Sequence, residues 1–173
     1  MEAPASSDSA VAVLRAIGRG GFAYAQTKEL ARAAGWNLVD DEWDLGYLRF
    51  DIPFAAGQDP PSSLVIEVQE SGRPPRAVVT LFYFEDYKVD RGPFDEAFRG
   101  LAAQLVGVLG APAQCGEYSY PHRAGWSYSY ASWSLADVTF VLVQDELDIQ
   151  FGMDVSLWVL PAGAAVNVPV SGA

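Results

Sequence analysis

Apolar and polar residues follow an order that occurs twice along the chain: a helical pattern ends at a glycine, and three strand-like runs come after it. The first copy occupies residues 22–87 and the second occupies residues 93–160. In the first copy, apolar residues recur at helical spacing from Phe22 to Ala34, and the pattern stops at Gly35. This repetition predicts a fold made of two similar halves.

The strand-like runs are short, rich in β-branched and aromatic residues, and joined by connections that contain Gly, Pro or acidic residues. They are residues 47–52, 64–69 and 77–84 in the first half, and 126–132, 138–143 and 147–151 in the second. Such spacing favours antiparallel neighbours. An acidic turn is expected at Asp145–Glu146, and residues 155–160 either continue the last strand or form a separate one.

The helix of the second half has the clearest local signals. Pro93 suits the first helical position, and Gly110 followed by Pro112 ends the pattern. Gly100 and Gly107 lie seven residues apart on one side of this helix, and each costs about 1 kcal/mol relative to Ala in a helix interior. We therefore expect the helix to approach the sheet closely there.

These elements predict an α+β fold: two α-β-β-β halves form a mainly antiparallel sheet, with the helices packed on one face. A shorter amphipathic helix precedes the first half. We expect a single domain over residues 1–160 and a flexible tail over residues 161–173. The segments 36–46 and 111–125 fall outside the repeated elements, at equivalent positions after each helix, and are predicted to be irregular.

Charge narrows the range of partners. The 173 residues include 22 acidic and 11 basic side chains, for a formal net charge of −11. This balance disfavours nucleic acid and anionic membranes, whose phosphates require Lys and Arg, and it favours association with a basic protein. No apolar run reaches the ~20 residues of a membrane span, and the first residues lack the basic region of a signal peptide. We expect a cytoplasmic protein, as a monomer or homodimer.

Few residues suggest catalysis. His122 and Cys115 are the only residues of their types and lie in no recognised catalytic motif, so we interpret them as a loop histidine and a half-buried structural thiol. The acidic groups Asp40–Asp44 and Asp145–Asp148 lack EF-hand spacing, and solvated loops explain them more simply than a metal site does. We predict no catalytic residues, metal or cofactor.

Two segments carry features of a recognition surface. An aromatic side chain ringed by carboxylates is a plausible anchor for a basic partner, and loop tyrosines are frequent contact residues. The predicted partner-binding residues are Asp40, Asp41, Glu42, Trp43, Asp44, Tyr118 and Tyr120.

A family resemblance points the same way. It rests on Ala31–Arg32–Ala33–Ala34–Gly35–Trp36, on Phe98–Arg99–Gly100–Leu101 with Leu109–Gly110–Ala111–Pro112, and on the Trp-bearing strand that follows. With these motifs the chain resembles small actinobacterial proteins that are encoded beside polymorphic toxins and presumed to be immunity proteins. The resemblance implies a non-enzymatic inhibitor that masks a basic toxin surface. A secretion chaperone or adaptor for an exported substrate is the alternative, and an enzyme that uses the carboxylates is a third hypothesis.

Overall fold

The computed structural model describes residues 7–54, 62–67, 75–84, 91–120, 126–148 and 152–166. The helices are α1 (Ser7–Arg19), α2 (Tyr24–Ala33) and α3 (Gly92–Leu109), with a short 3-10 helix, η1 (Trp43–Leu45). The strands are β1 (Asn37–Glu42), β2 (Tyr47–Ile52), β3 (Ser62–Glu67), β4 (Arg76–Phe84), β5 (Gln114–Tyr118), β6 (Tyr128–Ser134), β7 (Val138–Asp148) and β8 (Gly152–Pro161).

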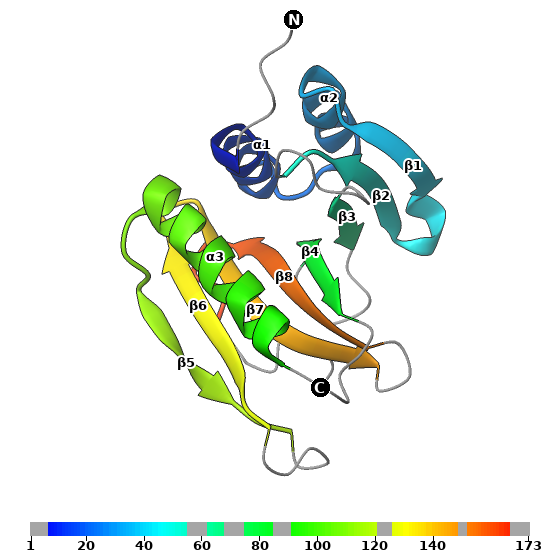
Figure 1. Cartoon of the computed structure of the whole chain (residues 1–173). Helices are drawn as coiled ribbons and strands as arrows, with labels where there is room; N and C mark the ends of the chain where they lie inside the picture. Colours follow the sequence, from blue (N-terminus) through cyan, green and yellow to red (C-terminus); the bar gives the residue numbers. More distant parts are fainter. Residues whose placement is uncertain are drawn as a thin grey trace, which may run out of the picture.

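All eight strands form one antiparallel sheet in the order β1-β2-β3-β4-β8-β7-β6-β5. Each half is a meander of four strands, and the two halves join where β4 pairs with β8 (Figure 1). The predicted α+β class, with an antiparallel sheet and helices on one face, is confirmed. Among the described helices, none is long and apolar enough to cross a membrane.

Each half contains one strand more than the sequence pattern indicated. Segments 36–46 and 111–125, predicted to be irregular, contain β1 and β5, which form the two outer edges of the sheet. Side-chain pairs across β1 and β2 explain why an acidic segment is extended here: Asp40 lies opposite Arg49, and Glu42 lies opposite Tyr47. Cross-strand pairs of this kind stabilise a sheet, and the order of residues along the chain does not show which residues pair.

The main core lies between the sheet and the helices. Val11, Leu14 and Ile17 of α1 are buried, as are Phe94 and Leu105 of α3. They pack against inward-facing strand residues such as Phe50, Leu64, Val79, Phe140, Leu142 and Leu157. Helix α3 packs over β4, β6, β7 and β8, whereas α2 lies beside β1 (Figure 1).

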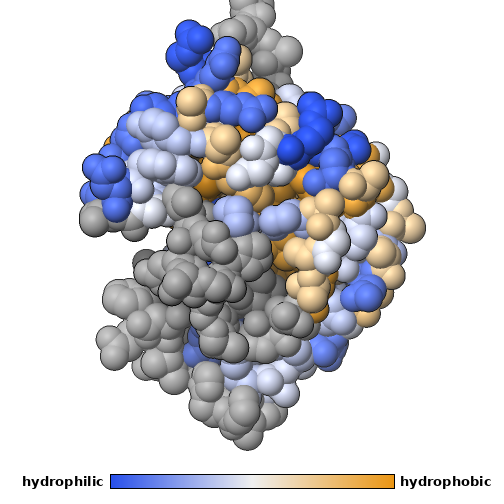
Figure 2. Space-filling view, turned by 180° about the vertical axis from the view of Figure 1, so that it is seen from behind, coloured by the Kyte–Doolittle hydropathy of each residue, from blue (hydrophilic) through white to orange (hydrophobic). Residues whose placement is uncertain are grey.

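A smaller apolar cluster covers part of the opposite face of the sheet. It contains Val78, Val141, Val143, Trp158 and Leu160, and Ala164 and Val166 pack against it. Figure 2 views the molecule from this side, with hydrophobic residues visible between hydrophilic ones. Residues 161–166 of the predicted tail therefore include apolar contacts, and residues 167–173 lie outside the described part.

The close approach of a helix to the sheet occurs at a different glycine from those expected. A Cβ on Gly18 of α1 would lie 2.6 Å from Cγ1 of Val138 and 3.1 Å from Cγ1 of Val159. At Gly100 and Gly107 of α3 a Cβ would meet nothing within 4 Å, so the expectation of close approach there is wrong. Both α3 glycines are on the exposed side of the helix.

The expected turn at Asp145–Glu146 is also wrong. Strand β7 continues through both residues to Asp148, and their side chains are buried. Residues 155–160 lie in β8, which is a separate strand from β7, and β7 already contains residues 147 and 148 of the predicted strand 147–151. Asp145 is thereby placed opposite Asp154 across the two strands.

Candidate partner-binding surface

The predicted partner-binding residues lie at two separate places. Asp40, Asp41 and Glu42 belong to edge strand β1, and Trp43 and Asp44 to η1. Tyr118 ends β5 and Tyr120 follows it, at the other edge of the sheet. Six strands separate these edges. The structure does not bring the two groups together, so they do not form one continuous site.

Most acidic side chains around β1 have partners within the chain. Asp40 forms an ion pair with Arg49 at 2.6 Å, and Asp41 forms one with Lys28 of α2 at 2.7 Å. The Lys28 ammonium, with the Tyr24 hydroxyl, holds the pKa of the Asp41 carboxyl below its usual value. These pairs neutralise part of the charge of the segment and fasten β1 to α2 and β2.

Glu42 and Asp44 are less neutralised by neighbouring cations than Asp40 and Asp41 are. Glu42 accepts a hydrogen bond from the Tyr47 hydroxyl at 2.5 Å, and this carboxylate raises the pKa of Tyr47. Within the described residues, no Lys or Arg side chain forms an ion pair with either carboxylate. Both side chains are exposed. They are the best-placed negative charges of the segment for meeting a basic surface.

Trp43 joins η1 to α2. Its ring lies 4.9 Å from the Tyr24 ring, centroid to centroid, and the Lys28 ammonium lies 4.8 Å from the Tyr24 centroid. The indole is half-buried against the main core. A partner could reach only part of it, so Trp43 contributes both to the packing of the edge and to its outer surface.

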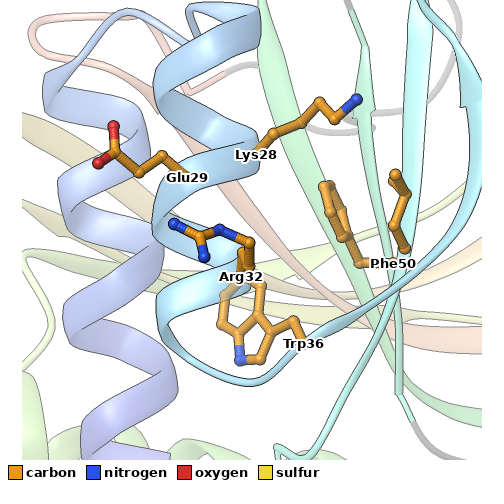
Figure 3. Close-up of a pocket in the computed structure, with 6 residues that line it drawn as sticks. Lys28, Glu29, Arg32, Trp36 and Phe50 are labelled. Carbon is orange, nitrogen blue, oxygen red and sulfur yellow. The ribbon is translucent and has the colours of Figure 1, made fainter.

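A pocket opens between α2 and β1, next to these residues. Its volume is about 470 Å³, and it is lined by Lys28, Glu29, Arg32, Trp36, Leu38 and Phe50. Figure 3 shows that α2 supplies Lys28, Glu29 and Arg32, whereas Trp36 lies on the loop that follows α2 and Phe50 lies across from the helix on β2. Leu38 and Phe50 share a face of the sheet because they lie opposite each other in β1 and β2. The pocket thus has apolar walls and charged side chains along the helix.

Sequence reasoning missed this pocket. Trp36 was noted only as the last residue of the 31–36 motif that contributes to the family resemblance. Leu38 lay in a segment that was expected to be irregular. The signal that could have found it is the pair of adjacent apolar residues, Leu38 and Val39, between a helix stop and an acidic run. Both side chains are 38% exposed in the structure. Exposed apolar side chains beside a pocket are typical of interaction surfaces.

The hydroxyl groups of Tyr118 and Tyr120 are occupied within the chain. Tyr120 donates a hydrogen bond to Oδ1 of Asp145 at 2.7 Å, and Tyr118 donates to the carbonyl of Gln144 at 2.5 Å. Burial, reinforced by the nearby Asp145 carboxylate, raises the pKa of Tyr118. Both rings are half-buried. These contacts hold the end of β5 against β7 and give the two tyrosines a structural role.

Around the same tyrosines lies a buried acidic cluster, Asp145, Glu146 and Asp154. Oδ1 of Asp145 also accepts the backbone N–H of Glu146 at 2.8 Å, and Glu146 accepts the Tyr128 hydroxyl at 2.7 Å. Asp154 accepts a hydrogen bond from the Ser156 hydroxyl. Burial, together with the neighbouring Asp145, raises the pKa of Asp154 to about 7. One oxygen each of Asp145 and Asp154 is buried and has no hydrogen-bond partner among the described residues.

The remaining candidates for chemistry do not assemble into a site. Cys115 lies on β5 and is exposed, so the expectation of a half-buried thiol is wrong. His122 is outside the described residues. Within the described ranges, no group of three or more His, Cys, Asp and Glu side chains is arranged to hold a metal ion.

Comparisons with protein-family models, with curated proteins and with solved structures gave no match for this chain.

Proposed function

We propose that this chain is a non-enzymatic, acidic partner-binding protein that acts as an immunity protein or inhibitor. Its binding surface is the β1 edge together with the adjoining α2 pocket. The observation that carries the proposal is the coincidence, at one edge of the sheet, of exposed Leu38 and Val39, a pocket of about 470 Å³, and the carboxylates of Glu42 and Asp44. This combination suits an apolar anchor from the partner, surrounded by basic groups.

Electrostatics supports a basic partner. The chain carries a formal charge of −11, which attracts a positively charged protein over a distance of about one Debye length, ~8–10 Å at physiological salt. Toxins that act on nucleic acids present basic clefts, and an acidic inhibitor can cover such a cleft. Rapid association is valuable for an inhibitor, because the toxin must be intercepted before it acts.

Co-expression with the product of the adjacent gene tests this proposal. We expect that product to stop growth when it is expressed alone, and we expect this chain to restore growth and to form a stoichiometric complex with it. A neighbour that is harmless alone, or a toxic neighbour that forms no complex with the chain, would contradict the proposal.

A secretion chaperone or adaptor is a second candidate, and the open edge of β1 favours it. A chaperone of this kind holds an extended segment of its substrate, and an unpaired strand beside an apolar pocket can accept one. The two functions differ in what is bound. A chaperone would bind an unfolded export substrate and form dimers, whereas an inhibitor would bind a folded toxin. Light scattering of the free chain and of each complex separates them.

A further inference from the structure

The outer side of β1 offers backbone groups for pairing. β1 is the first strand in the sheet order and pairs only with β2 in the described part of the chain. All its residues except Asp40 are exposed. An edge strand in this state presents unpaired N–H and C=O groups, and another extended segment can add to it as a further strand.

Two features restrict which segments can add. A bulge between Leu38 and Asp40 interrupts the regular register, and acidic side chains follow it. In a second copy of this chain, the same acidic residues would face these across the new pairing, and like charges placed opposite each other are destabilising. The edge therefore disfavours self-association, whereas a segment that contains Lys or Arg would meet opposite charge.

The pocket supplies a specificity element on one face of such an added strand. Leu38 points to the same side of the sheet as buried Phe50, which is the side covered by α2. Alternate side chains of a strand added along β1 would point to that side. In strand addition, main-chain hydrogen bonds provide affinity and side-chain pockets provide selectivity. A bulky apolar side chain is the group that fits apolar walls of this kind.

The other edge of the sheet lacks these properties. The large apolar side chains that are exposed in the described residues are Leu38, Val39, Tyr83 and Val106, and two of these lie on β1 and none on β5. At β5, a Cβ on Gly116 would lie 3.0 Å from the Tyr130 ring, and the Tyr118 hydroxyl is bonded inward. Strand addition is therefore favoured at β1 over β5.

We infer that the partner supplies an extended, Lys- or Arg-containing segment that pairs with β1 as a ninth strand and places one bulky apolar side chain in the α2–β1 pocket. This inference rests on the proposed function, because it specifies how the same surface recognises a basic protein. It identifies the bound element as a strand rather than a helix or a folded basic patch.

A short synthetic peptide tests the mode of binding with the full chain alone. In the probe, lysine and threonine alternate around a central tryptophan. Three comparison peptides carry alanine at the centre, glutamate in place of lysine, or proline at two threonine positions. Amide hydrogen exchange of the chain, with and without each peptide, locates the pairing, and calorimetry measures the affinity.

We expect the tryptophan peptide to slow exchange at β1 amides that do not bond to β2. Its affinity should fall by about tenfold or more with central alanine, with proline or with glutamate, because each change removes one component of the recognition. Leu38→Lys should cause a similar loss, since it puts a charge at the pocket. Val106→Lys is the matched control, because Val106 is 42% exposed on α3 against 38% for Leu38, and it should leave binding unchanged.

Protection elsewhere on the chain, or equal binding of the proline peptide, would overturn the inference. Absence of binding by the tryptophan peptide would also overturn it. The strand-addition inference and the proposed immunity function can fail independently of each other. If the peptide adds to β1 but the adjacent gene product is harmless, strand recognition stands and the immunity role does not. If a toxic neighbour binds without protecting β1, the immunity role stands and strand addition does not.

Discussion

The ionisation of a single carboxyl group in this protein depends on its burial and on its cross-strand neighbour, and Asp154 is the clearest case. It lies opposite Asp145 across β7 and β8, and Asp145 already accepts hydrogen bonds from Tyr118, Tyr120 and the Glu146 backbone. Asp154 accepts a hydrogen bond from the Ser156 hydroxyl. Burial is the main cause of the shift at Asp154, and the neighbouring Asp145 carboxylate adds to it, so that the pKa of Asp154 is raised from 3.8 to about 7.

This shift predicts a specific pH dependence of stability. Between pH 3.8 and about 7 the folded chain keeps a proton on Asp154 that the unfolded chain has lost. The free energy of unfolding should therefore decrease as the pH rises through this window, by up to about 1.4 kcal/mol per pH unit from this group. Asp154→Asn should flatten that slope and make the protein more stable than wild type above pH 7. Urea titrations across the window measure the effect.

Asp137→Asn is the matched control for this experiment. Asp137 forms an ion pair with Arg15 at 2.9 Å, and that hydrogen-bonded pair lowers the pKa of its carboxyl. The stability it contributes is present at neutral pH and is lost as the pH falls through its lowered pKa, so the sign is opposite to that of Asp154. An unchanged slope in Asp154→Asn, relative to wild type, would show that Asp154 is ionised in the folded protein.

At the scale of elements, helix glycines differ in whether the space beside them is filled, so replacing them with alanine should change stability in opposite directions. Gly18 of α1 lets the helix touch Val138 and Val159, whereas Gly107 of α3 faces open space. Gly18→Ala should destabilise the fold by about 1–3 kcal/mol, because the added methyl group overpacks a rigid, buried valine. Gly107→Ala should stabilise it by about 0.5–1 kcal/mol through helix propensity alone. Thermal and urea unfolding of both variants measure the contrast, and a stabilised Gly18→Ala would refute the packing shown here.

The sequence pattern was sufficient for the elements whose signals are local. Pro93 and Gly110 bounded α3, and Val11, Leu14 and Ile17 identified the buried face of α1. The two edge strands were missed because β1 is stabilised by cross-strand pairs such as Asp40 with Arg49, and a linear pattern does not show those pairs. The acidic pair Asp145–Glu146 resembled a turn because its tyrosine donors lie 18 to 27 residues away along the chain.

The same limitation applies to the candidate site. Acidic and aromatic residues in segment 40–44 could be identified from composition. The pocket could not, because its residues Arg32, Trp36 and Phe50 come together only when α2 packs beside β1 and β2. The sequence also could not show that Tyr118 and Tyr120 are far from the acidic segment. Only the strand order shows that these tyrosines lie at the opposite edge of the sheet.

At the scale of the whole molecule, we expect electrostatic steering to speed the association of the chain with its proposed basic partner. Glu42→Gln with Asp44→Asn should reduce the association rate by a few-fold at low salt, because two exposed carboxylates beside the pocket are lost, and should change the dissociation rate less. The difference should shrink as salt screens the charges. Glu96→Gln, which removes an exposed carboxylate from α3, is the control and should have a smaller effect. Stopped-flow fluorescence with the purified partner measures these rates, and equal slowing in both variants would assign the effect to net charge rather than to the β1 edge.

The most direct measurement of the central claim is amide hydrogen exchange of the full chain, free and in its stoichiometric complex with the partner protein. We expect slower exchange over residues 24–42, which include α2 and β1, and unchanged exchange in β5, residues 114–118. Protection confined to β5 or α3, with residues 24–42 exchanging as in the free protein, would contradict the account.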